Sequence, residues 1–166
     1  MTEPGDMWDK LLMEYMEGKR KKPSWIIGSP HYTGESGAID LVETVFFIKE
    51  AKKEDVLDAL RKGRMYACFN LGGEPVILNE FSAKNTGYGS IQIIIKGTQA
   101  PTAEPLKIEL IRNGQIFKKF EETNDEWAIT VEDNLSAGES RVYYRLKINN
   151  DSSLIFTNPV FAEVKK

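Results

Sequence analysis

Residues 106–120 read LKIELIRNGQIFKKF, and this stretch decides the fold class. Apolar and polar side chains alternate over residues 106–110, which is the period of a β-strand with one buried face. Asn113-Gly114 follows, a dipeptide that favours a two-residue hairpin turn because both of its positions take positive φ. The chain then returns over residues 115–120. The stretch therefore predicts an antiparallel hairpin.

Further strands are expected on both sides of this hairpin. Alternating or continuous apolar runs bounded by turn residues occur over residues 65–69, 76–81, 91–95, 127–131, 142–148 and 154–164. Short, evenly spaced strands without intervening helices are typical of a β-sandwich, and a lone cysteine excludes the disulfide of an antibody-type domain. The predicted fold class is therefore mainly β, an immunoglobulin- or fibronectin-III-like sandwich. Pro159 indicates an edge or a switch between sheets in the last run.

The front of the chain carries helical signals, so the sandwich is expected to follow a small helical segment. Asp6 is a candidate N-cap for an amphipathic helix over residues 8–16, and Gly18 ends it. Residues 24–27 (SWII) predict a short buried strand. The glycine-rich residues 28–37 predict a loop.

An extended apolar segment over residues 41–48 and a second helix complete the front half. The helix is expected to begin near Glu54, and Gly63 follows its last turn, where a left-handed residue commonly ends a helix. Its apolar face comprises Val56, Leu57 and Leu60. The sequence thus predicts two parts, a helical preface over residues 1–63 and a β-sandwich domain over residues 64–166.

The composition excludes several functional classes. The 166 residues include one histidine and one cysteine, too few for a zinc site of the usual His/Cys type or for an intrachain disulfide. A net charge of −3 argues against a nucleic-acid partner. No apolar run reaches the length of a membrane span, and the polar N-terminus has no secretory signal, so we expect no membrane partner. A lone cysteine favours a reducing, cytoplasmic location.

His31 is the first candidate for chemistry. It lies in a glycine-rich loop after the predicted strand over residues 24–27, where it could serve a metal or a phosphate. The alternative is a surface histidine with no ligand. Nearby carboxylates could contribute to a site for a hard cation; they are Glu35, Asp40 and Glu43.

Tyr143 is the second candidate. It projects from the strand over residues 142–148 to the side opposite Tyr144, because successive side chains of a strand point to opposite faces. It could stack there on a sugar or pack on a partner. The alternative is a single exposed tyrosine without a role.

The order of these segments resembles the end of a PHP (polymerase and histidinol phosphatase) domain followed by its associated β-sandwich. The front half carries the resemblance in Trp8-Asp9-Lys10-Leu11-Leu12, in the strand ending at Ile27-Gly28-Ser29 before His31, and in residues 43–67 (ETVFFIKEAKKEDVLDALRKGRMYA). The back half carries it in ELIRNG (residues 109–114), RVYYR (residues 141–145) and TNPVF (residues 157–161). Together these pieces cover most of the chain in the order of the family.

The resemblance implies a metal-dependent phosphoesterase as the parent protein. In that family a cluster of histidine and carboxylate ligands holds divalent metal ions, Mn, Zn or Fe. The last ligand motif, Ser-Asp-x-His in the family, here reads Ser29-Pro30-His31-Tyr32. Because Pro30 cannot ligate a metal and His31 stands one residue early, the resemblance implies that His31 is a remnant. We then expect no catalytic, cofactor-binding or metal-ligating residue in this chain, and Tyr32 joins Tyr143 as a candidate ligand or partner contact.

Three functional hypotheses result. The first is a non-catalytic accessory domain of a PHP-type phosphoesterase-like protein, which packs on an upstream catalytic domain or self-associates. The chain is then either the tail of a longer protein or a member of a branch that lost the metal site. The second is a carbohydrate- or peptide-binding β-sandwich module, which rests on fold analogy and on the candidate aromatic residues. The third, an autonomous metal hydrolase, requires one histidine and a few loop carboxylates to hold every metal.

Overall fold

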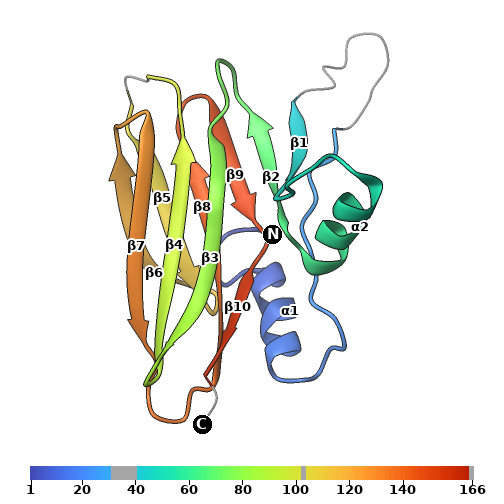
Figure 1. The fold of residues 1–166 in the computed structure, drawn as a ribbon, viewed down its shortest axis with the longest axis vertical. Helices are drawn as coiled ribbons and strands as arrows, with labels where there is room; N and C mark the ends of the chain where they lie inside the picture. The colour runs from blue at the N-terminus through green and yellow to red at the C-terminus, as the bar shows by residue number, and fades with distance from the viewer. Residues whose placement is uncertain (31–40, 102–103, 165–166) are drawn as a thin grey trace.

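Two antiparallel sheets face each other in the computed structural model, which describes residues 1–30, 41–101 and 104–164 (Figure 1). The larger sheet has the order β1-β2-β9-β8-β5-β6, with β10 also paired to β8. Its strands are β1 (Val42–Phe46), β2 (Met65–Asn70), β5 (Leu106–Arg112), β6 (Gln115–Glu122), β8 (Arg141–Asn149), β9 (Ser153–Thr157) and β10 (Val160–Glu163). The smaller sheet has the order β3-β4-β7, formed by β3 (Ile77–Gly87), β4 (Ser90–Thr98) and β7 (Glu126–Asn134). The predicted β-sandwich is confirmed.

The core lies between the sheets and follows the alternation of the sequence. Every second side chain of β7 is buried, beginning at Trp127. On the neighbouring β4, Ile91, Ile93 and Ile95 are inaccessible to solvent. They face the inward side chains of β8, which are Val142, Tyr144, Leu146 and Ile148. Each fully buried aliphatic side chain contributes about 1.5–3 kcal/mol of hydrophobic stabilisation.

The hairpin that decided the fold class forms as predicted. Asn113 and Gly114 connect β5 to β6 with φ values of 48° and 82°, so both residues of the turn occupy the left-handed region. A register shift between Leu110 and Ile111 places an irregularity just before the turn. Both side chains are fully buried, which strict alternation does not allow and the irregularity does.

Pro159 interrupts the last apolar run and divides it into β9 and β10. Both strands pair with β8, but β9 also pairs with β2, whereas β10 comes to lie beside β3 of the smaller sheet. There the side-chain amide of Asn85 donates to the carbonyl oxygen of Glu163 at 3.1 Å. The proline thus marks the point where the chain passes from one sheet towards the other, one of the two roles expected for it.

Both helices form where the sequence predicts them. Helix α1 (Met7–Met16) starts after Asp6, although the Asp6 side chain makes no capping hydrogen bond. Helix α2 (Lys53–Lys62) ends at Gly63, whose φ of 68° lies in the left-handed region. A Cβ at Gly63 would also stand 2.7 Å from the indole ring of Trp25, so both conformation and space require glycine there.

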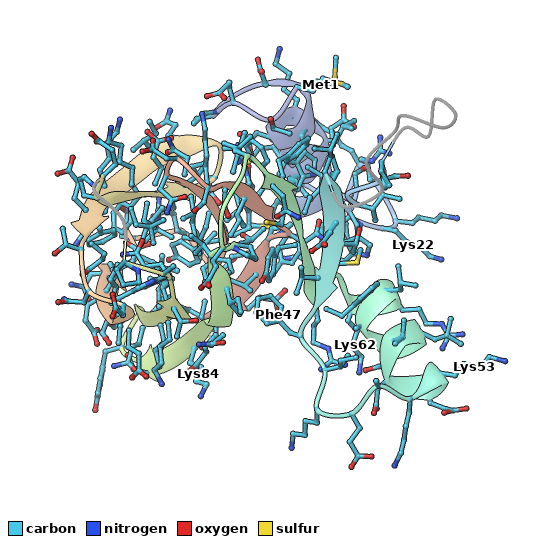
Figure 2. All side chains as sticks on the ribbon, turned by 90° about the horizontal axis from the view of Figure 1, so that it is seen from above. Met1, Lys22, Phe47, Lys53, Lys62 and Lys84 are labelled. Carbon is cyan, nitrogen blue, oxygen red and sulfur yellow. The ribbon has the colours of Figure 1, made fainter. Side chains whose placement is uncertain are left out.

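One strand of the front half, β1, belongs to the larger sheet. Strand β1 pairs antiparallel with β2 along its whole length, with Val42 opposite Phe69 and Phe46 opposite Met65, and it forms the edge of the larger sheet (Figure 1). The predicted division between residues 63 and 64 therefore falls between two paired strands. Helix α2, by contrast, stands apart from the strands, as Figure 2 shows around Lys53 and Lys62.

Candidate functional site

A buried ionic cluster fixes α1 on the outer face of the larger sheet. Asp9 of α1 and Arg145 of β8 have exposed fractions of 2% and 0%. The guanidinium donates to both carboxylate oxygens, from Nε to Oδ1 at 2.7 Å and from Nη2 to Oδ2 at 2.6 Å. The backbone N–H of Gly5 donates to Oδ2 at 2.8 Å, and the Trp8 ring covers the guanidinium at 4.9 Å. Two parallel hydrogen bonds fix distance and orientation together, so the cluster sets the position of α1 on the sheet.

Tyr143 belongs to this cluster, and the prediction of an accessible contact residue is wrong. It does point to the face opposite Tyr144, but α1 covers that face and the side chain is fully buried. Its hydroxyl donates to Oδ1 of Asp9 at 2.9 Å. Burial, and then the charge of Asp9, raise the pKa of Tyr143 far above its ordinary value. Tyr143 thus cannot stack on a sugar, and the surface on which it packs is a helix of the same chain.

Residues 24–28, here called the strap, continue from α1 across the larger sheet. The predicted buried strand is wrong at this point: the strap lies outside both sheets, Trp25 is half-buried and Ile27 is 60% exposed. Instead of pairing with a neighbouring strand, the backbone of the strap forms hydrogen bonds with two side chains. The Asn158 amide accepts from the N–H of Ile26 at 2.7 Å and donates to its carbonyl at 3.0 Å. The Thr44 hydroxyl does the same for the backbone of residue 28, at 2.9 and 2.8 Å.

The strap passes so close to β1 that only glycine fits at position 28. A Cβ there would collide with the carbonyl oxygen of Glu43. At its other end the strap is tied to α1, because the indole N–H of Trp8 donates to the carbonyl of Ser24 at 2.8 Å. Helix α1 and the strap therefore lie on the sheet and are fixed at the helix, at Asn158 and at β1.

The candidate metal ligands are not brought together in the described part of the chain. His31, Tyr32, Glu35 and Asp40 lie outside the described residues. Within residues 1–30, 41–101 and 104–164, no three His, Cys, Asp or Glu side chains are grouped closely enough to hold a metal ion. Glu43 lies on β1 opposite Cys68. No chemical step through a metal is assigned to the described residues.

Cys68, the lone cysteine, is 2% exposed. Burial raises the pKa of its thiol, which keeps it protonated and weakly nucleophilic at neutral pH. The thiol packs in the core between the sheets, so its role is that of a small apolar side chain.

A second polar network joins the two sheets at one end of the sandwich. Arg112 of β5 donates from Nε to Asp133 of β7 at 2.6 Å and from Nη2 to Glu139 at 2.9 Å. The Tyr144 hydroxyl of β8 donates to the same Asp133 carboxylate at 2.5 Å. The hydrogen bond from Arg112 is the main cause that lowers the pKa of Glu139 below its ordinary value. The network links strands of both sheets, and its groups are paired with one another.

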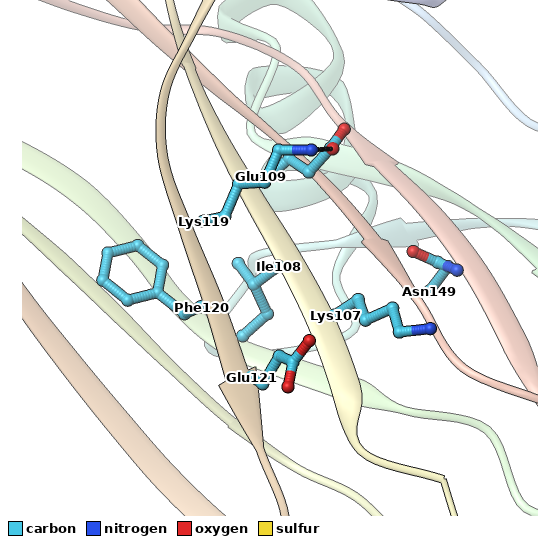
Figure 3. Close-up of a pocket in the computed structure, with 7 residues that line it drawn as sticks. All are labelled: Lys107, Ile108, Glu109, Lys119, Phe120, Glu121 and Asn149. Carbon is cyan, nitrogen blue, oxygen red and sulfur yellow. Dashed lines mark ion pairs between the residues drawn. The ribbon is translucent and has the colours of Figure 1, made fainter.

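A shallow hollow of about 370 Å³ lies on the outer face of β5, β6 and β8 (Figure 3). Its charged lining residues are Lys107, Glu109, Lys119 and Glu121, and Asn149, Ile108 and Phe120 complete it. Lys119 pairs with Glu109 across the two strands at 2.8 Å. Two cations and two carboxylates leave no net charge, so the hollow favours neither an anion nor a cation. It is a solvated sheet surface with ordinary cross-strand pairs.

The apolar face predicted for α2 is partly accessible to solvent. Leu57 and Leu60 are each 37% exposed, and Ala59 is the buried residue of this helix. The helix rests on the strap at its C-terminal end, where the Trp25 indole N–H donates to the carbonyl of Arg61 at 3.4 Å. The sequence contains one signal for this exposure, because charged residues stand before, between and after the two leucines along the helix. They are Glu54, Asp55, Asp58, Arg61 and Lys62.

Comparisons with protein-family models, with curated proteins and with solved structures gave no match to this chain. Among the helices of the described residues, none is long and apolar enough to cross a membrane.

Proposed function

We propose that this chain is a non-catalytic accessory domain of a PHP-type phosphoesterase-like protein, with an immunoglobulin-like sandwich as its body. The observation that carries the proposal is the Asp9–Arg145 pair. Asp9 lies in the segment that resembles the end of a PHP domain, and Arg145 lies in the segment that resembles the associated sandwich. Because this pair is buried and bidentate, it joins the two resembling parts in one fixed arrangement. Such an arrangement suits a domain that supports another protein surface.

The catalytic metals of the parent family, Mn, Zn or Fe, belong in this proposal to an upstream catalytic domain. The one ligand motif with a counterpart here has Pro30 in the place of the aspartate, and proline has no side-chain donor for a metal. The contribution of this chain is then to bind its partner and to hold it in place. Its contact surface is that of α2, where apolar side chains remain exposed.

The carbohydrate- or peptide-binding alternative loses one of its two candidate aromatic contacts, because Tyr143 lies under α1, and the other, Tyr32, lies outside the described residues. Aromatic platforms for sugars need an accessible ring face. No second function is therefore proposed.

A phosphatase assay of the purified chain tests the proposal. We expect no turnover of p-nitrophenyl phosphate above the protein-free blank with Mn²⁺, Zn²⁺ or Mg²⁺. Circular dichroism of the same sample establishes that the chain is folded. Metal-dependent turnover that is lost in His31→Ala contradicts the proposal, because the lone histidine would then be a working ligand. Turnover that survives in His31→Ala indicates a contaminating enzyme, and its removal by a further purification step must restore the blank.

A further inference from the structure

The turn between β5 and β6 carries the one asparagine of this chain that a glycine follows, Asn113. This dipeptide is chemically reactive as well as favourable for the turn. The backbone nitrogen of Gly114 can attack Cγ of Asn113, because glycine has no side chain to hinder the approach. The new bond closes a five-membered succinimide ring, and the side-chain nitrogen leaves as ammonia with the proton of the attacking N–H. Water then adds to one of the two ring carbonyls and opens the ring to aspartate or isoaspartate.

In the folded chain, β8 holds the Asn113 side chain. Its Oδ1 accepts from the backbone N–H of Tyr143 at 3.0 Å, and the N–H of Asn113 donates to the carbonyl of Tyr143 at 3.1 Å. Asn113 is half-buried and borders a hollow of about 350 Å³ lined by α1 and the turn, so water can reach it. To close the ring, the side chain must leave Tyr143 and rotate toward the nitrogen of Gly114. The turn itself must therefore open before the reaction can start.

The N-terminal segment keeps this turn from opening. Gly114 is buried, and a Cβ there would stand 3.1 Å from Cβ of Asp9 and 3.5 Å from the Tyr143 hydroxyl. A Cβ on Gly5 would lie 3.7 Å from the Gly114 carbonyl oxygen. Asp9 is fixed in turn by its bidentate pair with Arg145. The docked segment thus lies directly against the reacting dipeptide.

We propose that Asn113 is a deamidation site that the docked N-terminal segment blocks, and that isoaspartate at this position prevents α1 from docking again. Isoaspartate inserts one carbon atom into the main chain of the two-residue turn, which displaces Gly114 from its contact with Asp9. Aspartate, the other product, retains the length of the turn and the acceptor for the N–H of Tyr143. An opening of α1 is therefore recorded permanently in the chemistry of the turn. Neither step depends on the proposed accessory function.

Mass spectrometry of peptides from the whole chain, after incubation at mildly alkaline pH, tests the block. Asn113 should deamidate at least about 100-fold more slowly in native buffer than in concentrated urea, because the reaction waits for the folded unit to open. Water enriched in heavy oxygen labels only the carboxyl groups that form during the incubation. Asn124, which is exposed and precedes Asp125, is the internal control. It should stay unmodified in both samples, because the side chain of the next residue hinders the attack.

Two variants loosen α1 in different ways. Asp9→Ala leaves the buried Arg145 without its partner and should accelerate deamidation in native buffer about 100-fold or more. Leu12→Ala empties a fully buried position of the same helix without a change of charge and should accelerate it about 30-fold or more. Glu3→Ala, which removes only the exposed pair with Lys147, is the matched control and should stay within about fivefold of wild type. Circular dichroism establishes that each variant is folded.

Four results overturn the proposal. An unreactive Asn113 in urea overturns the site, and a wild-type rate in native buffer equal to that in urea overturns the block. Wild-type rates in both Asp9→Ala and Leu12→Ala also overturn the block, because α1 would then not provide it. The fourth result concerns the isoaspartate form, isolated by chromatography and refolded. It should lack protection of α1 in hydrogen exchange, whereas Asn113→Asp should retain it, and an isoaspartate form with a protected α1 overturns the second step.

Discussion

Removing the carboxylate of Asp9 should destabilise the whole chain. The substitution Asp9→Ala leaves the Arg145 guanidinium, which is 0% exposed, without its counter-charge and without its two acceptors. It also removes the acceptor of the Tyr143 hydroxyl. A buried charge that loses its partner costs about 3–5 kcal/mol, far more than the intact pair contributes. We therefore expect the free energy of unfolding of Asp9→Ala to fall by about that amount.

Two further variants isolate the cause. In Asp9→Ala/Arg145→Met both charges are absent, so the double variant should recover most of the loss, because replacing a buried pair by apolar groups is often neutral. Glu3→Ala is the control for an exposed ion pair. Glu3 binds Lys147 at 2.6 Å but is 59% exposed at its side chain, and such pairs contribute at most about 1 kcal/mol.

Urea unfolding followed by tryptophan fluorescence and by far-ultraviolet circular dichroism measures these differences. Trp8 reports on the cluster itself, because its ring lies over the Arg145 guanidinium. The two signals should change together if α1 and the sandwich unfold as one unit. A loss below about 1 kcal/mol in Asp9→Ala, with coincident transitions, would refute the reasoning, since the pair would then be solvated in solution.

Three other expectations follow from the structure. Gly28→Ala should lower stability more than Gly18→Ala in urea unfolding, because a Cβ at Gly28 collides with the backbone of β1, whereas at Gly18 the space is open and only the φ of 75° opposes alanine. Equal losses would contradict the position of the strap. In an alkaline titration followed at 295 nm, Tyr66, Tyr143 and Tyr144 should stay protonated at pH ~11, since burial raises the pKa of Tyr66 to about 12 and raises those of the other two further. Burial of these three protonated tyrosines stabilises the fold below their unfolded pKa of about 10, and this stabilisation is lost as pH rises above it. Titration of all tyrosines before the chain unfolds would contradict their burial. The ion pair with Arg112 lowers the pKa of Glu139 in the folded chain, which stabilises the fold at pH values above the pKa of this carboxyl in the unfolded chain. The stability advantage of wild type over Glu139→Gln should therefore vanish as pH falls below about 4. An advantage that grows on acidification would contradict the ion pair.

Local patterns predicted the strands and their turns well. The alternation around Trp127 and the Asn113-Gly114 turn depend on neighbours in sequence, and both formed as expected. The end of α2 at Gly63 is also a local matter, because a glycine in the left-handed region is a common way to end a helix. In each case the physical cause acts within a few residues, so a single sequence contains it.

The outer layer could not be predicted in the same way. Alternation placed Tyr143 on the face opposite Tyr144, but it does not say which segment covers that face. Asp9 and Arg145 are separated by 136 residues, and no local rule pairs one buried charge with another at that distance. The extended strap was predicted as a strand because its residues are apolar, whereas its backbone is bound by side chains of Thr44 and Asn158. Candidate sites on the outer face were for this reason the least predictable part of the molecule.

The central claim is that the helical front segment and the sandwich form one cooperative unit that leaves α2 exposed for a partner. Native-state hydrogen exchange measures this most directly. The account predicts that the core amides of α1, around Leu12, exchange with the same opening free energy as those of β8, while α2 exchanges through smaller openings. Rapid exchange of α1 while β8 stays protected would contradict the claim, because the helix would then be a separate and mobile preface.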